Sequence, residues 1–165
     1  MKHLLSYLFI PFFLFMSCDS WLDLGSEDRI MENTLFSSQA GFMTALNGVY
    51  IELNTNELYG RNLTAGALDV MGQYYSVASS SHAFYNYGGL VYTGNDEKAL
   101  FDNMWQKCYA VIACCNTIIE KCDENKAGLS PVWKGSIKGE ALALRAMLHF
   151  DMLRLFGPLT SELDK

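Results

Sequence analysis

The amino-acid sequence predicts a mostly α-helical fold with helical hairpins of the tetratricopeptide-like type. Apolar residues recur at helical spacing across residues 131–156, and Ser130 followed by Pro131 is typical of a helix start. A second helical segment, at about 95–122, precedes this one across the short polar loop 123–129. Helices joined by so short a loop pack as antiparallel neighbours. The sequence shows one such hairpin and no second copy at the period of a repeat array.

Residues 1–17 have the composition of a secretory signal peptide. Lys2 supplies a positive charge, residues 4–16 are almost wholly apolar, and Cys18 follows directly. This order predicts cleavage before Cys18 and attachment of a lipid there, which anchors a protein to a membrane without spanning it. The alternative is an ordinary signal peptide with an incidental cysteine, because Phe15 stands where lipoprotein signals usually carry leucine.

Residues 18–37 are polar and aperiodic, so we expect a tether between the anchor and a helical domain at 38–165. The first helix of that domain is predicted at about 38–54 and the second at about 60–73. The residues of the first helix expected to face a core are Phe42, Leu46, Val49 and Leu53.

The helix predicted at about 95–122 carries four cysteines, which are Cys108, Cys114, Cys115 and Cys122. Positions seven apart on a helix lie about 10.5 Å apart, which is too far for a disulfide. The spacing also lacks the paired cysteines and nearby histidine of zinc sites, so we predict no metal. Three of the cysteines share the apolar face of the helix, which indicates small buried side chains.

The helix predicted at 131–156 has two apolar flanks, an arrangement that suits an element covered from two sides. We expect Gly157 to end this helix in a left-handed conformation and Pro158 to prevent its continuation. The first flank consists of Ile137, Ala141, Leu144, Leu148, Met152 and Leu155. The second consists of Leu142, Ala143, Ala146, Phe150 and Leu153. Charged residues between the flanks are expected to hold neighbouring helices in register.

The segment 74–95 holds six aromatic residues among 22, about twice the 13% of the whole chain. Tyrosine offers a flat apolar face and a polar tip, which suits stacking on a sugar ring together with a hydrogen bond to a hydroxyl group. The candidate ligand-binding residues are Tyr74, Tyr75, His82, Tyr85, Tyr87 and Tyr92. The alternative is that these aromatic side chains only cover the helix ends.

The charge of the chain and the motifs it lacks argue against two classes of function, nucleic-acid binding and catalysis. The net charge of −6 disfavours a nucleic-acid partner, whose phosphates require a basic surface. The chain has no Gly-x-Ser-x-Gly, His-Glu-x-x-His or phosphate-binding glycine loop, and its carboxylates have roles on helix surfaces and caps. We therefore expect no enzymatic activity, no cofactor and no catalytic residue.

The stretch 139–157 resembles the helix signature of the SusD/RagB family of nutrient-binding outer-membrane lipoproteins. The matching residues for which we expect a structural role are Gly139, Glu140, Ala141, Arg145, Ala146, Phe150, Arg154 and Gly157. Residues 36–50, with Tyr50, resemble the first helix of the family, and residues 105–119, with Asn116, resemble the helix that precedes the signature. Together these segments cover nearly the whole chain in the order of the family.

The resemblance implies a surface-exposed protein, held to the outer membrane by a lipid, that captures nutrients. The ligand would be a glycan or another nutrient, and the partner a TonB-dependent outer-membrane transporter. Family members continue beyond the signature, so we expect residues 38–165 to form an incomplete N-terminal domain. The alternative function is a helical-repeat scaffold lipoprotein that binds another protein and no sugar.

Overall fold

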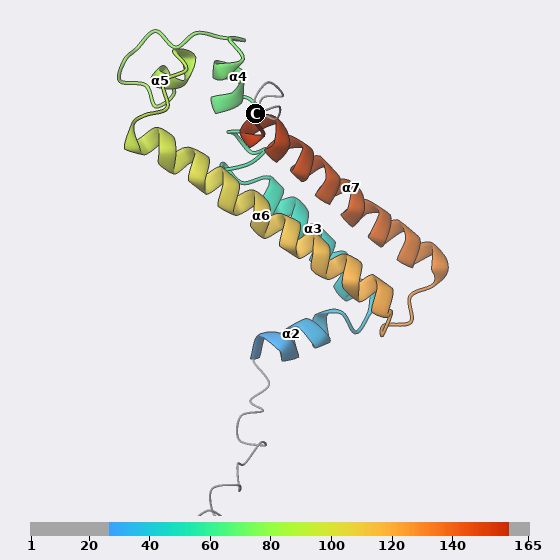
Figure 1. Ribbon diagram of the computed structural model, residues 1–165. Helices are drawn as coiled ribbons and strands as arrows, with labels where there is room; N and C mark the ends of the chain where they lie inside the picture. Colours follow the sequence, from blue (N-terminus) through green and yellow to red (C-terminus); the bar gives the residue numbers. More distant parts are fainter. Residues whose placement is uncertain (1–26, 159–165) are drawn as a thin grey trace, which may run out of the picture. The chain divides into compact units, whose positions relative to one another are not determined.

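The computed structural model describes residues 27–158, and every regular element in that range is a helix (Figure 1). This confirms the predicted fold class. The chain divides into two units, residues 1–34 and 35–165. The first helix, α2, spans Glu27–Leu35 and lies almost wholly in the first unit. The expectation of an aperiodic tether was therefore wrong for this part of the segment, while the predicted signal peptide and Cys18 lie outside the described residues.

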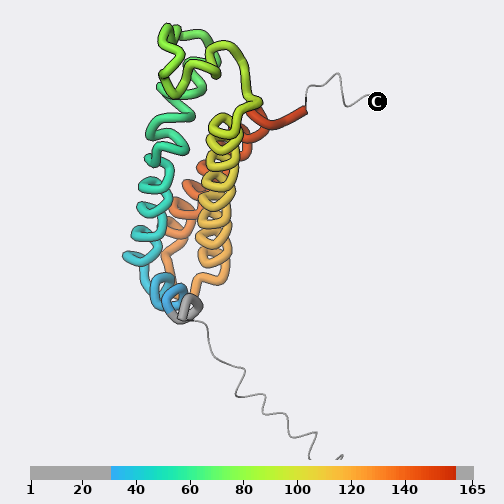
Figure 2. Tube along the Cα trace, turned by 90° about the vertical axis from the view of Figure 1, so that its left-hand side faces the viewer, coloured from blue at the N-terminus to red at the C-terminus, as the bar shows by residue number. Residues whose placement is uncertain are grey.

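Three helices of the second unit lie side by side, as Figures 1 and 2 show: α3 at Gln39–Leu53, α6 at Asn95–Glu124 and α7 at Pro131–Phe156. Their bounds lie within two residues of the predicted ones. Ser38 caps α3 and Ser130 caps α7, each by accepting a hydrogen bond from a backbone N–H of the first turn. The predicted hairpin of α6 and α7 is present.

Two short helices, α4 at Ala67–Met71 and α5 at Tyr85–Gly88, precede α6. The predicted helix at 60–73 was wrong in its first half, because residues 54–66 form a series of turns. The chain folds back closely here, and a Cβ at Gly60 would lie 2.4 Å from the carbonyl oxygen of Asn54. Such a close approach favours glycine and turns over a continuous helix.

The three long helices share one apolar core, and α6 contributes the three cysteines expected to be buried. Cys108, Cys115 and Cys122 are each 0% exposed, whereas Cys114 is exposed. Burial raises the pKa of the Cys108 and Cys115 thiols to about 11, so both stay protonated at neutral pH. The four expected core residues of α3 are buried as well: Phe42, Leu46, Val49 and Leu53.

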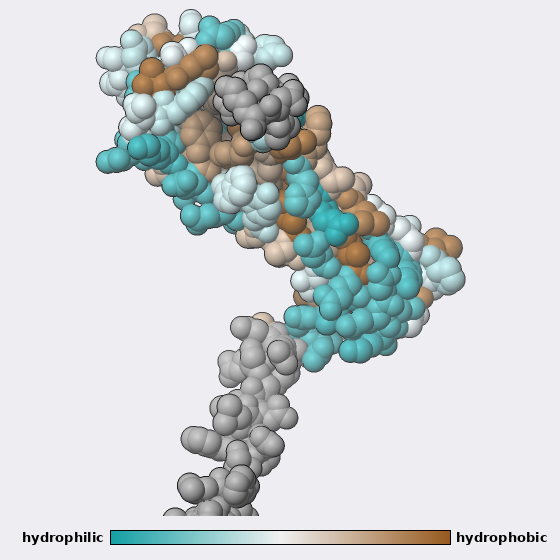
Figure 3. Space-filling view, in the orientation of Figure 1, coloured by the Kyte–Doolittle hydropathy of each residue, from teal (hydrophilic) through white to brown (hydrophobic). Residues whose placement is uncertain are grey.

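Only one of the two apolar flanks of α7 is covered within the described residues. Five of the six residues on the first flank are buried, and the sixth, Leu155, packs against the core from its edge. On the second flank, Phe150 is 58% and Leu153 is 64% exposed. Figure 3 shows such apolar residues (brown) at the surface along α7, whereas polar residues gather over the C-terminal end of α6.

Polar side chains at the edges of α7 hold it against the other two helices. The Tyr50 hydroxyl donates to Glu140 Oε1 at 2.5 Å, and Arg145 Nη1 donates to Asn116 Oδ1 at 2.8 Å. Each bond joins a signature residue of α7 to a residue that the family resemblance had singled out on α3 or α6. These two bonds fix the rotation of α7 about its axis.

Three further contacts involve charged residues of α7. Asp151 accepts a hydrogen bond of 2.5 Å from the Tyr59 hydroxyl and pairs with Arg154 at 3.1 Å. Lys138 pairs with Asp123 at 2.5 Å, across the hairpin from the end of α6. The charged residues between the flanks therefore contact α3, α6 and the turns that follow α3.

The end of α7 differs from the expected left-handed stop. Gly157 has φ −68° and ψ 149°, which is extended backbone, whereas Asn125 at the end of α6 has the left-handed φ of 48°. The reason is Pro158, because the residue before a proline is driven towards extended conformations. Among residues 27–158, no helix is both long enough and apolar enough to cross a membrane.

Candidate functional site

The aromatic segment between α4 and α6 folds around a small core of its own. Ala67, Val70 and Tyr87 form this core, and Phe101 of α6 packs against it. The Tyr87 and Phe101 rings meet edge to face with centroids 5.9 Å apart. The segment is therefore attached to the N-terminal part of α6, at one end of the three-helix bundle (Figure 1).

Two of the six candidate ligand residues serve this packing. Tyr87 is 2% exposed, and its burial, reinforced by the negative charges of Glu97 and Asp96, raises its pKa to about 12. Tyr92 is partly buried against Phe101, and burial raises its pKa as well. For these two residues the structure agrees with the alternative that aromatic side chains cover the helix ends.

A hydrogen bond from α5 to α6 fixes the shape of the segment. Asn86 Nδ2 donates to Glu97 Oε1 at 2.7 Å, and Glu97 is 6% exposed. This bond, assisted by the backbone N–H of Glu97 itself, lowers the pKa of the carboxyl group. Gly94 leaves the room that the carboxylate occupies, since a Cβ there would lie 2.0 Å from Glu97 Oε2.

The segment encloses a cleft of about 360 Å³, which is our candidate functional site. Its lining combines the side chains of Tyr75 and Tyr85 with the amides of Gln73 and Asn86 and the hydroxyl group of Ser76. Aromatic faces stack on the apolar face of a sugar ring, while amides and hydroxyls donate to and accept from its hydroxyl groups. The cleft therefore offers aromatic and hydrogen-bonding groups beside the apolar side chains of Val70, Val77 and Val91.

The backbone around the cleft is held by specific hydrogen bonds. The Tyr75 hydroxyl donates to the carbonyl oxygen of Ala65, and Gln73 Nε2 donates to that of Gly88 at 2.9 Å. Gln73 itself has the left-handed φ of 61°, which turns the chain sharply after α4. The first bond ties the wall that carries Tyr75 to the turn before α4, and the second joins two parts of the lining, Gln73 and the end of α5.

The remaining candidate residues lie on the surface of the segment. Tyr74 is 83% exposed and His82 is exposed, with its Nδ1 accepting a hydrogen bond from the backbone N–H of Phe84. Tyr75 and Tyr85, each 43% exposed, are the two candidates that meet in the cleft. Sequence reasoning missed Gln73 and Asn86, because no sequence pattern marks an isolated amide side chain as part of a site.

The described residues offer no metal site, and the groove between α3 and α6 does not suit a sugar. Among the described residues, no three His, Cys, Asp or Glu side chains are grouped closely enough to hold a metal ion. A groove of about 320 Å³ lies between α3 and α6, but its lining is mainly apolar, with Phe36, Val49 and Ile118 among its walls. A sugar needs more hydrogen-bonding partners than this groove offers.

Comparison with known proteins supplies a family context. Residues 20–164 match the family model SusD-like_3, whose description is starch-binding associating with outer membrane. The chain is similar to SusD-like protein P2 of Formosa agariphila, with 24% identity over 131 residues. It is also similar to SusD-like protein P25 of the same organism, with 23% identity over 172 residues.

These relatives are much longer than the present chain. The match to protein P2 covers 76% of this chain and 24% of that protein, and the match to protein P25 covers 94% and 30%. The chain thus spans about a quarter to a third of the length of these curated relatives. No solved structure matches it at a significant level.

Proposed function

The chain belongs to the SusD-like family, and we propose on that premise that it captures glycans at the outer membrane and passes them to a TonB-dependent transporter. The observation that carries this proposal is the match of a starch-binding family model over residues 20–164. Capture and transfer need binding alone, so the protein carries out no covalent chemistry. This agrees with the absence of catalytic motifs from the sequence.

We place glycan binding in the cleft of the aromatic segment. Tyr85 and Tyr75 supply faces for stacking, and the amides of Gln73 and Asn86 supply donors and acceptors for sugar hydroxyls. Tyr74 and His82 are exposed on the same segment, outside the cleft. Because Asn86 is held by the buried Glu97, one polar group of the site is oriented before the ligand binds.

Attachment to the membrane follows from the start of the chain. The apolar stretch at 4–16 and Cys18 support a cleaved lipoprotein signal, with a lipid on Cys18 and the folded part at the cell surface. Labelling with radioactive palmitate tests this step. The label should appear in the wild type and be absent from Cys18→Ser, and an unlabelled wild type would refute the anchor.

Affinity electrophoresis in native gels tests glycan capture. We expect retardation of the wild-type protein by at least one polysaccharide of a panel that includes starch, and its loss in Tyr85→Ala. The control is Phe150→Ala, which removes another exposed ring, 58% exposed and on α7 outside the cleft. Migration unaffected by every polysaccharide would refute glycan capture, and equal loss in both variants would refute the cleft as the site.

One observation favours a second function, a scaffold that binds another protein and no sugar. The exposed flank of α7 presents Leu142, Phe150 and Leu153 on one face of the helix. Purification of tagged protein from outer membranes separates the two functions. Recovery of a TonB-dependent transporter together with glycan retardation supports capture, whereas a partner lost in Phe150→Ala and no retardation supports the scaffold.

A further inference from the structure

Aromatic rings form a continuous series from the candidate segment to the outer side of the hairpin of α6 and α7. Consecutive ring centroids lie 4.6–6.4 Å apart, within the range of favourable aromatic contacts. The series runs through His82, Phe84, Tyr87, Tyr92, Phe101, Phe156, Trp105, Tyr109 and His149. Its middle members are packed against the core clusters, and its far end is open to solvent.

The far end is a second cleft, of about 270 Å³, in which Trp105, Tyr109, His149 and Phe156 lie beside Met152 and Leu153. Trp105 is 42% exposed, and Tyr109 and Phe156 are each 37% exposed. Phe156 meets Trp105 nearly at right angles, with centroids 5.1 Å apart, and Tyr109 packs on Trp105 at 4.6 Å. These contacts hold the indole in place while Trp105 remains exposed to water.

Polar groups lie beside the exposed indole. His149, which is exposed, lines the cleft with its ring 6.0 Å from that of Tyr109. The Trp105 indole N–H, the Tyr109 hydroxyl and the His149 imidazole provide donors and acceptors around an apolar face. This combination suits a sugar ring better than a purely apolar ligand, because each hydroxyl group at the ring edge needs a partner.

We infer that Trp105 and Tyr109 form a second stacking platform for the glycan, separate from the cleft of Tyr75 and Tyr85. The inference rests on the proposed function. The platform lies at the same end of the bundle as the first site, three ring contacts of 5.4, 6.2 and 5.1 Å from Tyr92. A long chain occupying both sites gains affinity over a short one, because its second contact is intramolecular.

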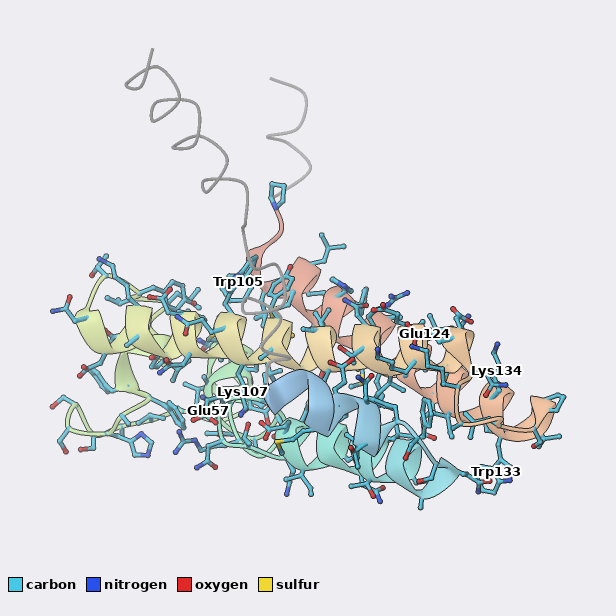
Figure 4. The ribbon with its side chains drawn as sticks, turned by 90° about the horizontal axis from the view of Figure 1, so that it is seen from below. Glu57, Trp105, Lys107, Glu124, Trp133 and Lys134 are labelled. Atoms are coloured by element: carbon cyan, nitrogen blue, oxygen red, sulfur yellow. The ribbon has the colours of Figure 1, made fainter. Side chains whose placement is uncertain are left out.

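Two equally exposed tryptophans allow a controlled test of the second platform. Trp105 and Trp133 are both 42% exposed, and Figure 4 shows them towards opposite ends of α7. Trp133 lies in the first turn of α7 and is absent from the lining of both clefts. Affinity electrophoresis would compare the wild type with Trp105→Ala and Trp133→Ala on the polysaccharide that retards the wild type most. Thermal melting of each variant gives the folding control.

We expect Trp105→Ala to bind at least about fivefold more weakly and Trp133→Ala to bind like the wild type. Equal binding by all three proteins would overturn the second platform and leave glycan capture intact. A wild type that no polysaccharide retards would overturn both proposals. Retardation weakened equally in both variants would also overturn the platform, since it would report a general effect on the fold.

If Trp105→Ala fails to fold, tryptophan fluorescence can test whether the glycan contacts Trp105. In the double variant Trp21→Phe and Trp133→Phe, Trp105 is the remaining indole of the chain. We expect its fluorescence to shift or be quenched on titration with the retarding polysaccharide, with saturation at the concentration that saturates retardation. Unchanged emission from a protein that still binds would overturn the platform.

Discussion

Two tyrosine hydroxyls donate to carboxylates of α7. Removing each in turn tests how far burial sets the contribution of such a hydrogen bond to the stability of the bundle. Tyr59 donates to Asp151 and Tyr50 to Glu140, both at 2.5 Å. The two bonds differ in burial, since Tyr59 is partly buried and Tyr50 is 43% exposed. Substitution by phenylalanine removes the same single oxygen in both cases and keeps the ring.

We expect Tyr59→Phe and Tyr50→Phe to lower the free energy of unfolding by different amounts, because the two hydroxyls differ in burial. A hydrogen bond to a charged group contributes about 1.5–3 kcal/mol, and its loss leaves a partly buried carboxylate with one donor fewer. Tyr59→Phe should therefore lower the free energy of unfolding by about 2 kcal/mol. At the exposed site water replaces the lost donor, and Tyr50→Phe should lower it by under about 1 kcal/mol.

The pH dependence of the unfolding free energy tests the Tyr59 hydrogen bond independently. Burial, reinforced by the hydrogen bond to Asp151, raises the pKa of Tyr59 well above its usual value near 10. A group whose pKa is raised on folding contributes stability that is fully present below the unfolded pKa and is lost as the pH rises through the folded pKa. From neutral pH up to about pH 10 the difference in unfolding free energy between wild type and Tyr59→Phe should thus be constant, and it should shrink above pH 10.

Urea unfolding followed by far-ultraviolet circular dichroism measures both effects. The urea dependence of the unfolding free energy should be the same in the three proteins, which shows that the unfolded states are comparable. If Tyr59→Phe loses no more stability than Tyr50→Phe, burial does not set the strength of these bonds and the reasoning is wrong.

Two further predictions concern packing, and thermal melting checks both. Leu148→Ala, at a side chain 0% exposed, should lower stability by about 2–5 kcal/mol, whereas Phe150→Ala on the open flank should stay within about 0.5 kcal/mol. Similar losses would mean that both flanks are covered. Gly41→Ala should destabilise the start of α3, because its Cβ would lie 1.6 Å from the carbonyl oxygen of Leu35. Gly139 has open space around it, so Gly139→Ala should raise the free energy of unfolding by about 0.5–1 kcal/mol. If Gly41→Ala also raised the free energy of unfolding, the close approach at Gly41 would be refuted.

The long helices were predictable because several local signals agree on them. At α7 the cap Ser130, the proline after it and one complete apolar flank all indicate the same bounds, and the structure has them. The cysteines of α6 were predictable from spacing alone, because seven residues make nearly two helical turns and return to the same face. Tertiary contacts then only confirm what the local pattern requires.

The candidate site was predictable as a region and not as a set of residues. Aromatic density marked the segment, but Tyr87 faces inwards and Tyr85 lines the cleft, although they are two positions apart. The difference depends on the contact of Tyr87 with Phe101 of α6, which a local pattern cannot express. Likewise the role of Asn86 depends on Glu97, eleven residues later in another helix.

The helical bundle and the loops attached to it hold the candidate sites in place. Residues 54–66 and 72–84, which contain no helix, are each tied to a neighbouring element, as Tyr59 is to α7 and Gln73 to Gly88. Loops attached in this way can hold aromatic side chains open to water without losing their arrangement. The core of the bundle supplies the fixed frame, and the ring series through Phe101 and Phe156 attaches both clefts to it. A glycan that spans both clefts would meet surfaces whose spacing is set by α6 and α7, so its affinity would depend on the hairpin as much as on the loops.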